Sequence, residues 1–219
     1  MAPSYAGRAT LATMSDDQER LAAARAAYAG LQPRVTSGEP WPLAATFGTE
    51  PEASWGPREV LAHVAEMLPF WLGELEGVVE GGAGGGTTPF GRSADDPIRI
   101  GSLARDRTLP LRVLFARIDA GLRAWEDRLA SLTDDEQARP GLHPRLGEMP
   151  ATDILERFVV GHAEDHVAQL ETILANGKRA ATRRPRPPAV RSSTDGPWLA
   201  GSLDPYGAVP GERSAPQWC

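Results

Sequence analysis

The stretch LRVLFARIDAGLRAWEDRLASL, residues 111–132, carries the clearest structural signal in the chain. Its apolar side chains recur at alternating intervals of four and three residues, at Leu111, Phe115, Ile118, Leu122, Trp125, Leu129 and Leu132. This spacing is the period of an α-helix and differs from the strict alternation of a half-buried strand. A single apolar stripe along a helix has to be buried against other helices. The stretch therefore predicts a helix after Thr108 that packs in a bundle.

Three other segments have the same period. A first helix is expected after Ser15, which forms a capping box with Gln18, and it is expected to end at Pro33. A second starts at Pro57, a residue suited to the first turn of a helix, and ends in a run of glycines. Pro69 marks a point where this second helix can kink. The apolar stripes of these two helices are Leu21, Ala24, Tyr28 and Leu31, and Val60, Val64, Met67, Trp71, Leu75 and Val78.

A fourth helix is expected from Pro150 to Gly177, with Gly177 closing it in the left-handed conformation. Its stripe is Leu155, Val159, His162, His166, Leu170 and Ile173. Thr133 and Glu136 form a second capping box that predicts a short helical turn. Residues 141–149 read as a loop, and no segment reads as a strand.

These elements predict an all-α protein, a four-helix bundle with long loops and an irregular C-terminal tail. Residues 1–14 are expected to form a disordered leader, residues 15–177 the bundle, and residues 178–219 an Arg/Pro-rich disordered tail. The connections 32–56 and 81–107 are longer than usual bundle loops and look irregular; loops of this length are either functional or mobile. Trp41, Phe47 and Trp55 are expected to anchor the first of them onto the core, and Trp71 and Trp125 are expected in the core itself.

Charge and composition exclude several classes of protein. The chain has 219 residues, with 23 basic and 29 acidic side chains. From Lys178 onward seven residues are basic and three acidic, so the expected bundle is acidic and the tail basic. An acidic body argues against a nucleic-acid binder, and the basic tail is interpreted as a solvated segment. No apolar run is long enough to span a membrane. The only cysteine, Cys219, excludes an internal disulfide and fits a cytoplasmic location.

Three of the four histidines lie at positions of apolar stripes. His162 and His166 are four residues apart, so they lie on one face of the fourth helix, and His63 lies on the second helix in line with Val60 and Met67. Facing helices can bring these three imidazoles together inside the bundle. Neutral imidazole binds zinc, nickel or ferrous iron, and three such donors leave a coordination position for water or substrate. We therefore predict a divalent metal site formed by His63, His162 and His166.

Other interpretations of these residues stay open. A His-x-x-x-His spacing is weak by itself, and a lone buried histidine is more often a hydrogen-bonded core residue. The fourth histidine, His143, is expected to be exposed in a loop. The glycine run 81–86 lacks the Gly-Lys-Ser/Thr ending of a phosphate-binding loop and reads as a flexible linker. No general base is assigned; Glu66 and Asp165 are candidates for supporting the metal ligands through hydrogen bonds.

Several motifs together resemble a known family. The segment WGPREVLAH at 55–63, the segments GLHP at 141–144 and GE at 147–148, and GHAEDHVAQL at 161–170 are similar to the second helix, last loop and last helix of the DinB-like, damage-inducible helical-bundle family. The resemblance covers residues 14–177. It implies a bundle that holds a metal through one histidine of the second helix and two of the last. The long insertion at 81–107 and the tail have no counterpart in the resemblance.

The resemblance also implies a function. Members of this family include transferases and isomerases that use the low-molecular-weight thiols mycothiol or bacillithiol, and dimers are common among them. The expected function is therefore a metal-dependent enzyme acting on a small molecule, with a low-molecular-weight thiol as possible cosubstrate and a homodimer as possible assembly. The alternative is a non-enzymatic helical stress or binding module. The two differ in geometry, because only metal binding requires the three imidazoles to converge.

Overall fold

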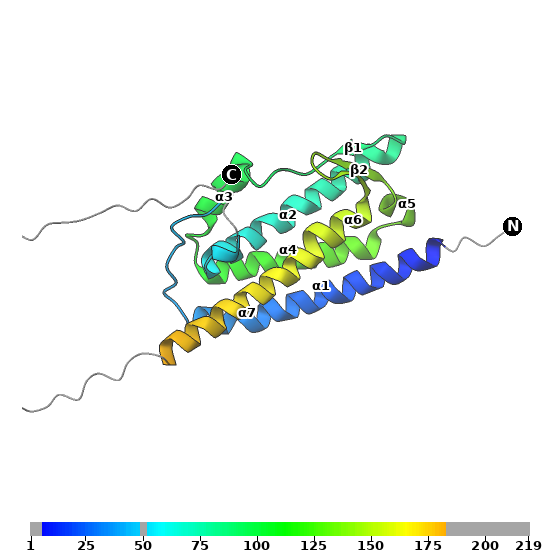
Figure 1. Cartoon of the computed structure of the whole chain (residues 1–219). Helices are drawn as coiled ribbons and strands as arrows, with labels where there is room; N and C mark the ends of the chain where they lie inside the picture. Colours follow the sequence, from blue (N-terminus) through cyan, green and yellow to red (C-terminus); the bar gives the residue numbers. More distant parts are fainter. Residues whose placement is uncertain (1–5, 49–51, 183–219) are drawn as a thin grey trace, which may run out of the picture. The chain divides into compact units, whose positions relative to one another are not determined.

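The computed structural model describes residues 6–48 and 52–182. They belong to one compact unit, Met1–Arg184, while a second unit, Pro185–Cys219, lies outside the described residues, as does most of the expected tail. Four long helices build the bundle: α1 (Ala6–Thr36), α2 (Pro57–Gly81), α4 (Leu111–Ser131), and a last helix of three consecutive segments, α6 (Ala151–Leu155), the π turn η3 (Glu156–Val160) and α7 (Gly161–Thr182). The predicted four-helix bundle is confirmed (Figure 1).

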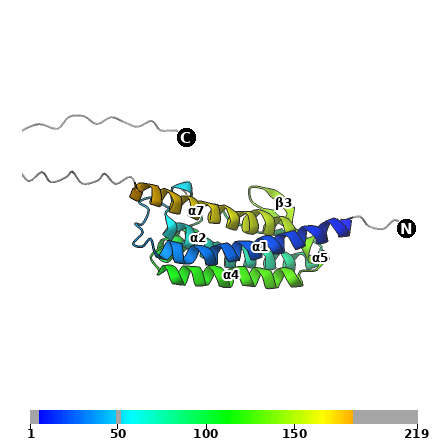
Figure 2. The ribbon, with the colours of Figure 1, turned by 90° about the horizontal axis from the view of Figure 1, so that it is seen from below.

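The order of the helices around the bundle explains the long connections. Helix α1 packs on α4 and α7, and α2 packs on the same two helices, so α1 and α2 lie on a diagonal. Helices α2 and α4 run in one direction and α1 and α7 in the other (Figures 1 and 2). A chain that leaves α2 must therefore return along the bundle before α4 can begin, which a short bundle loop cannot do.

This returning connection contains more regular structure than expected. It includes the turn η2 (Gly82–Gly84), the strand β1 (Thr88–Pro89) and the helix α3 (Pro97–Asp106). At the start of α3 the Asp96 side chain accepts a hydrogen bond from the backbone N–H of Arg99 at 2.8 Å, and Pro97 occupies the first turn. The prediction of an irregular segment is wrong here, because an Asp–Pro start is a helix signal that the search for apolar stripes passes over.

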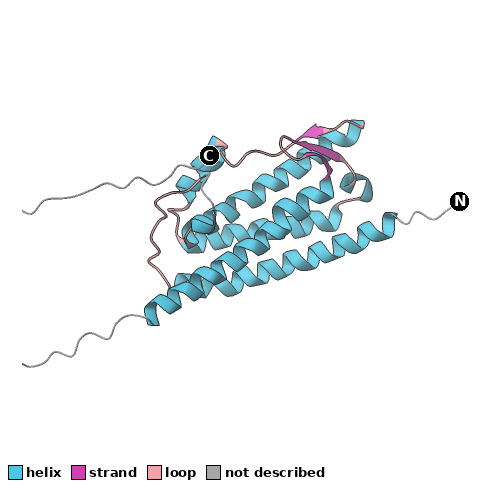
Figure 3. Ribbon diagram, viewed as in Figure 1, coloured by secondary structure: helices cyan, strands magenta, loops and turns pink. Residues whose placement is uncertain are grey.

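The prediction of a loop at 141–149 is also wrong, because these residues belong to a β-hairpin. Strands β2 (Pro140–His143) and β3 (Gly147–Pro150) pair antiparallel, and β1 joins β2 in parallel (Figure 3). Gly147 has a φ of +83°, which places the turn in the left-handed region that glycine favours. Strands this short and rich in Gly and Pro show no alternating pattern that a sequence could reveal. The short helix α5 (Asp134–Gln137) precedes the hairpin and carries the predicted capping box.

Several predicted helix ends differ from the structure. Helix α1 begins at Ala6 and not at Ser15, because the alanine-rich segment before Ser15 favours helix. It continues past Pro33 for one more turn, and α2 runs without interruption through Pro69. Helix α7 does not end at Gly177, because glycine costs a helix only about 1 kcal/mol and helix-forming residues follow it.

The core lies between the four helices. Trp125 is fully buried, and its Nε1–H donates to the carbonyl of Leu68 at 3.0 Å, which ties α4 to α2. Trp71 is buried as predicted, Trp55 is buried, and Trp41 and Phe47 pack on the core in part. Within the described ranges, no helix combines the length and apolarity that crossing a membrane requires.

Candidate metal centre

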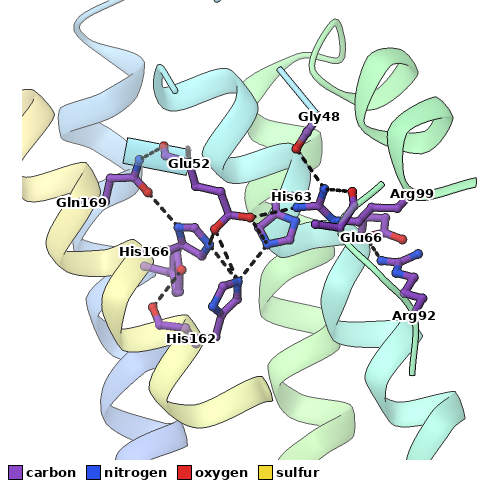
Figure 4. Close-up of polar contacts among 12 residues, drawn as sticks. Gly48, Glu52, His63, Glu66, Arg92, Arg99, His162, His166 and Gln169 are labelled. Atoms are coloured by element: carbon purple, nitrogen blue, oxygen red, sulfur yellow. Dashed lines mark hydrogen bonds and ion pairs between the residues drawn. The ribbon is translucent and has the colours of Figure 1, made fainter. Parts of the chain in front are cut away.

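The three predicted histidines meet between α2 and α7 (Figure 4). The Nε2 atom of His162 lies 2.9 Å from Nε2 of His63 and 3.2 Å from Nε2 of His166. His63 and His166 are buried, and the His162 side chain is 32% exposed. All three rings therefore turn the same nitrogen toward one point, which is the geometry that the sequence predicts for metal ligands.

A carboxylate completes the cluster. Glu52 lies in the short turn η1 (Glu52–Ser54), and its oxygens are 3.7 Å from Nε2 of His63, 3.8 Å from Nε2 of His162 and 3.6 Å from Nε2 of His166. One donor atom from each of the four residues lies within 4.8 Å of the others, so the group could hold a metal ion. Sequence reasoning missed Glu52, because it lies in the irregular connection before α2, where no periodic pattern indicates which side chains face the core.

The local fold sets the direction of each histidine. His63 is placed by the buried stripe of α2, between Val60 and Met67. The π turn η3 precedes His162, and the backbone N–H of Gly161 donates to the carbonyl of Glu156, five residues back. Such a turn holds one more residue than an α-turn, so it changes the rotation of the residues that follow relative to those before. It thus lets α6 keep its apolar side chains buried while α7 directs its two histidines at α2.

Gln169 determines which nitrogen of His166 is free. The Gln169 side-chain amide donates to the backbone carbonyl of Glu52 at 2.5 Å, so its Oε1 is the atom that faces Nδ1 of His166, at 2.8 Å. That oxygen only accepts, so Nδ1 carries the proton and Nε2 keeps its lone pair toward the cluster. Metal-binding histidines commonly have such a partner on their second nitrogen.

A set of polar contacts holds the segment that carries Glu52. The buried Arg99 donates to the Glu52 carboxylate at 2.8 Å and to the carbonyls of Gly48 and Ala94 at 3.1 and 3.0 Å (Figure 4). In the first turn of α2, the fully buried Glu59 accepts from Arg107 at 3.2 Å. Arg99 comes from the connection that returns along α2, so this connection fixes the position of the Glu52 carboxylate.

Burial keeps the imidazoles of His63 and His162 neutral at pH 7. Burial, and then the neighbouring His166 and His162, lower the pKa of His63 well below its ordinary value of 6.5. The pKa of His162 is lowered to about 4, by burial first and then by His166 and Arg99. Neutral imidazole is the form that binds a metal, whereas a protonated ring repels one. A cation between the three Nε2 atoms would bind their lone pairs, in place of the hydrogen bonds that neutral rings can form with one another.

The donor set fits a small divalent cation. Bonds of about 2.0–2.1 Å to four tetrahedral donors place the donors about 3.3 Å from one another. The nitrogen–nitrogen and nitrogen–oxygen separations given above run from 2.9 to 3.8 Å and bracket this value. Nδ1 of His63 is buried without a hydrogen-bond partner, and the ring is held by an edge-to-face contact with Trp55, with 5.4 Å between the ring centroids. Three imidazoles and one carboxylate match zinc, nickel and ferrous iron.

Two openings reach the cluster. A pocket of about 150 Å³ has Glu52, His63 and His162 in its lining and continues to a wall of apolar and arginine side chains. A shallower groove reaches His162 and His166 and is bordered by Asp165 and Gln169. Small molecules can therefore approach the donor atoms from solvent.

The other candidates from the sequence lie elsewhere. His143 is buried and not exposed as predicted, because the hairpin folds it onto Phe158, with 5.3 Å between the stacked rings. Its Nδ1 accepts hydrogen bonds from the backbone N–H groups of the hairpin turn, and it lies outside the cluster. Glu66 pairs with Arg92 at 2.5 Å, and Asp165 is exposed at the border of the groove. Among the described residues, Gln169 is the side chain outside the cluster that forms a hydrogen bond with one of the three imidazoles.

Comparison with known proteins agrees with these features. A search of curated proteins finds no match to the chain. A family model, described as the DinB superfamily, matches residues 8–170, which cover most of the bundle and all four residues of the cluster. The match extends over well more than half of the chain, and the chain belongs to the DinB superfamily.

Proposed function

We propose that this protein is a metal-dependent enzyme whose divalent ion, zinc, nickel or iron, is held by His63, His162 and His166. The observation that supports the proposal is the convergence of three Nε2 atoms from two helices, next to the carboxylate of Glu52 and an open pocket. A divalent ion in such a site is a Lewis acid that activates a bound small molecule at neutral pH.

We further propose that a low-molecular-weight thiol is the cosubstrate, which the resemblance to thiol-dependent transferases and isomerases supports. A divalent cation lowers the pKa of a thiol and favours the nucleophilic thiolate. If the thiol takes the fourth position in place of Glu52, that carboxylate is placed to accept the thiol proton, because it faces the point where the three nitrogens converge. Arg99 holds that carboxylate in place, and Gln169 holds the ring of His166.

The alternative of a non-enzymatic helical module is less well supported. It predicts histidines that are satisfied by one another or by the backbone, with no accessible pocket beside them. The three Nε2 atoms are close enough to hydrogen-bond with one another, but they also share one point with a carboxylate, and the pocket opens onto that point. The resemblance also favours a homodimer, which analytical ultracentrifugation of the full chain would test.

The thiol proposal is tested with the full chain loaded with cobalt(II), a coloured substitute for zinc. Mycothiol, bacillithiol and glutathione are each added, and the near-ultraviolet absorption of a cobalt–sulfur bond is measured. We expect at least one of the three to produce this band, and the corresponding alcohol to produce none. No band with any of the three, in protein shown to hold cobalt, would contradict the thiol cosubstrate.

A further inference from the structure

The pocket beside the cluster has an apolar wall. Met67 and Trp71 of α2 and Phe158 of the π turn contribute to its lining. The rings of Trp71 and Phe158 are stacked, with centroids 4.3 Å apart and planes 16° apart. A planar or apolar body of a small molecule can pack against such a surface and remove it from water.

The same pocket contains two arginines. Arg92 and Arg99 both lie in the connection that returns along α2, and both line the pocket (Figure 4). Their side chains are only 11% and 7% exposed. A guanidinium that has lost most of its water needs hydrogen-bond acceptors in return, because an unpaired buried charge is costly.

The protein uses only part of these donors. The Arg99 guanidinium donates three hydrogen bonds to described residues, namely to Gly48, Ala94 and Glu52. A guanidinium has five N–H groups, so not all of them are used. Arg92 donates to Glu66 at 2.5 Å, and its guanidinium lies 3.7 Å from the ring centroid of Phe70. Both arginines are thus fixed in position by protein groups and retain N–H groups for an additional acceptor.

We propose that this pocket binds the carboxylate of a small organic acid through Arg92 and Arg99, with the apolar body of the acid on Trp71 and Phe158. The planar fork of a guanidinium matches a carboxylate, which accepts two parallel hydrogen bonds. Glu52 and Glu66 each pair with one of these arginines and balance their two charges, so a ligand with a single negative charge suits the pocket better than a phosphate with two. This inference rests on the proposed function, since it names the class of the second substrate at the same centre.

The test uses benzoate as the probe and benzyl alcohol as its uncharged counterpart. Binding to the full chain is measured by ligand-observed NMR titration, with and without zinc. We expect benzoate to bind in both forms and benzyl alcohol to bind much more weakly. Arg92→Gln should weaken benzoate binding roughly tenfold or more, because it removes a charge-assisted hydrogen bond. Arg145→Gln, at an exposed arginine outside the pocket, should leave it unchanged.

The outcomes separate this inference from the proposed function. Zinc content and helical circular dichroism are measured on each variant to show that it is folded. Unchanged benzoate affinity in folded Arg92→Gln would overturn the arginine site, whatever the zinc content. Equal binding of benzyl alcohol, or displacement of benzoate by an equal concentration of inorganic phosphate, would overturn the carboxylate. A chain that binds benzoate through Arg92 but holds neither zinc, nickel nor ferrous iron would contradict the proposed function alone.

Discussion

The Nε2 atoms of His63 and His162 lie 2.9 Å apart, although 99 positions separate the two residues in the chain. The pKa of each ring is lowered, so both rings are neutral at pH 7. The contact is therefore not stabilised by a positive charge on either ring. His166 and Glu52 add two more donors within 4.8 Å. A divalent cation accounts for all four positions at once.

Gln169→Ala should weaken zinc binding by about 10- to 100-fold, the usual effect of losing the partner of a metal-binding histidine. The physical reason is that Nδ1 of His166 loses the acceptor that fixes its proton. Zinc affinity is measured by competition with a chelator of known strength. Gln32→Ala, at an exposed position of α1, is the matched control and should bind zinc as tightly as the unmodified chain. Equal affinities for the two variants would show that Gln169 does not position the ring.

Inserting one alanine after Arg157 should abolish tight zinc binding while helical circular dichroism stays nearly constant. The π turn already holds one residue more than an α-turn, so a further residue rotates those after it by about 100° relative to α6. The matched control is Arg157→Ala, which keeps the length of the turn and changes only an exposed side chain. We expect its zinc affinity to stay within a factor of about two. Normal zinc binding by the insertion variant would mean that the rotation set at the π turn does not direct the histidines.

His143→Asn should reduce the loss of stability that the chain suffers between pH 7 and pH 5. Burial, and then Arg145 and Arg157, lower the pKa of His143 below 6.5 in the folded chain. The neutral ring therefore stabilises the fold above pH 6.5, and this contribution is lost as the pH falls toward the lowered pKa. An asparagine oxygen can accept the same hydrogen bonds from the turn without titrating.

Urea unfolding of both proteins at pH 7 and pH 5 measures this effect. Since His63 and His162 titrate in both, the difference between the two proteins isolates His143. At pH 7 we expect the variant to be less stable by about 0.5–1.5 kcal/mol, because it loses the stacking on Phe158. A fall in stability as large as that of the unmodified chain would contradict a buried neutral His143.

Periodicity was sufficient for the parts of the fold that are held by apolar stripes. Helices α2 and α4 begin and end close to where their stripes do, and the histidines converge because they occupy stripe positions on two helices. Gln169 could have been predicted, because it lies three residues after His166 and so on the same face of the helix.

Other features depend on contacts between distant segments, which a pattern along the chain does not contain. Glu52 reaches the cluster because Arg99, 47 positions later, holds it there. The hairpin that buries His143 pairs residues through the backbone, and strands of two to four residues leave no trace in the side-chain pattern. The π turn leaves none either, because Leu155, Val159, His162 and His166 follow the spacing of a regular helix in the sequence.

The metal content of the full chain tests the central claim most directly. The protein is purified without an affinity tag, loaded separately with zinc, nickel and ferrous iron, dialysed, and measured by elemental analysis. We predict about one divalent ion per chain, loss of that ion in His162→Ala with helical circular dichroism unchanged, and its retention in His143→Asn. Absence of bound metal after all three loadings, or unchanged metal content in His162→Ala, would contradict the three-histidine centre.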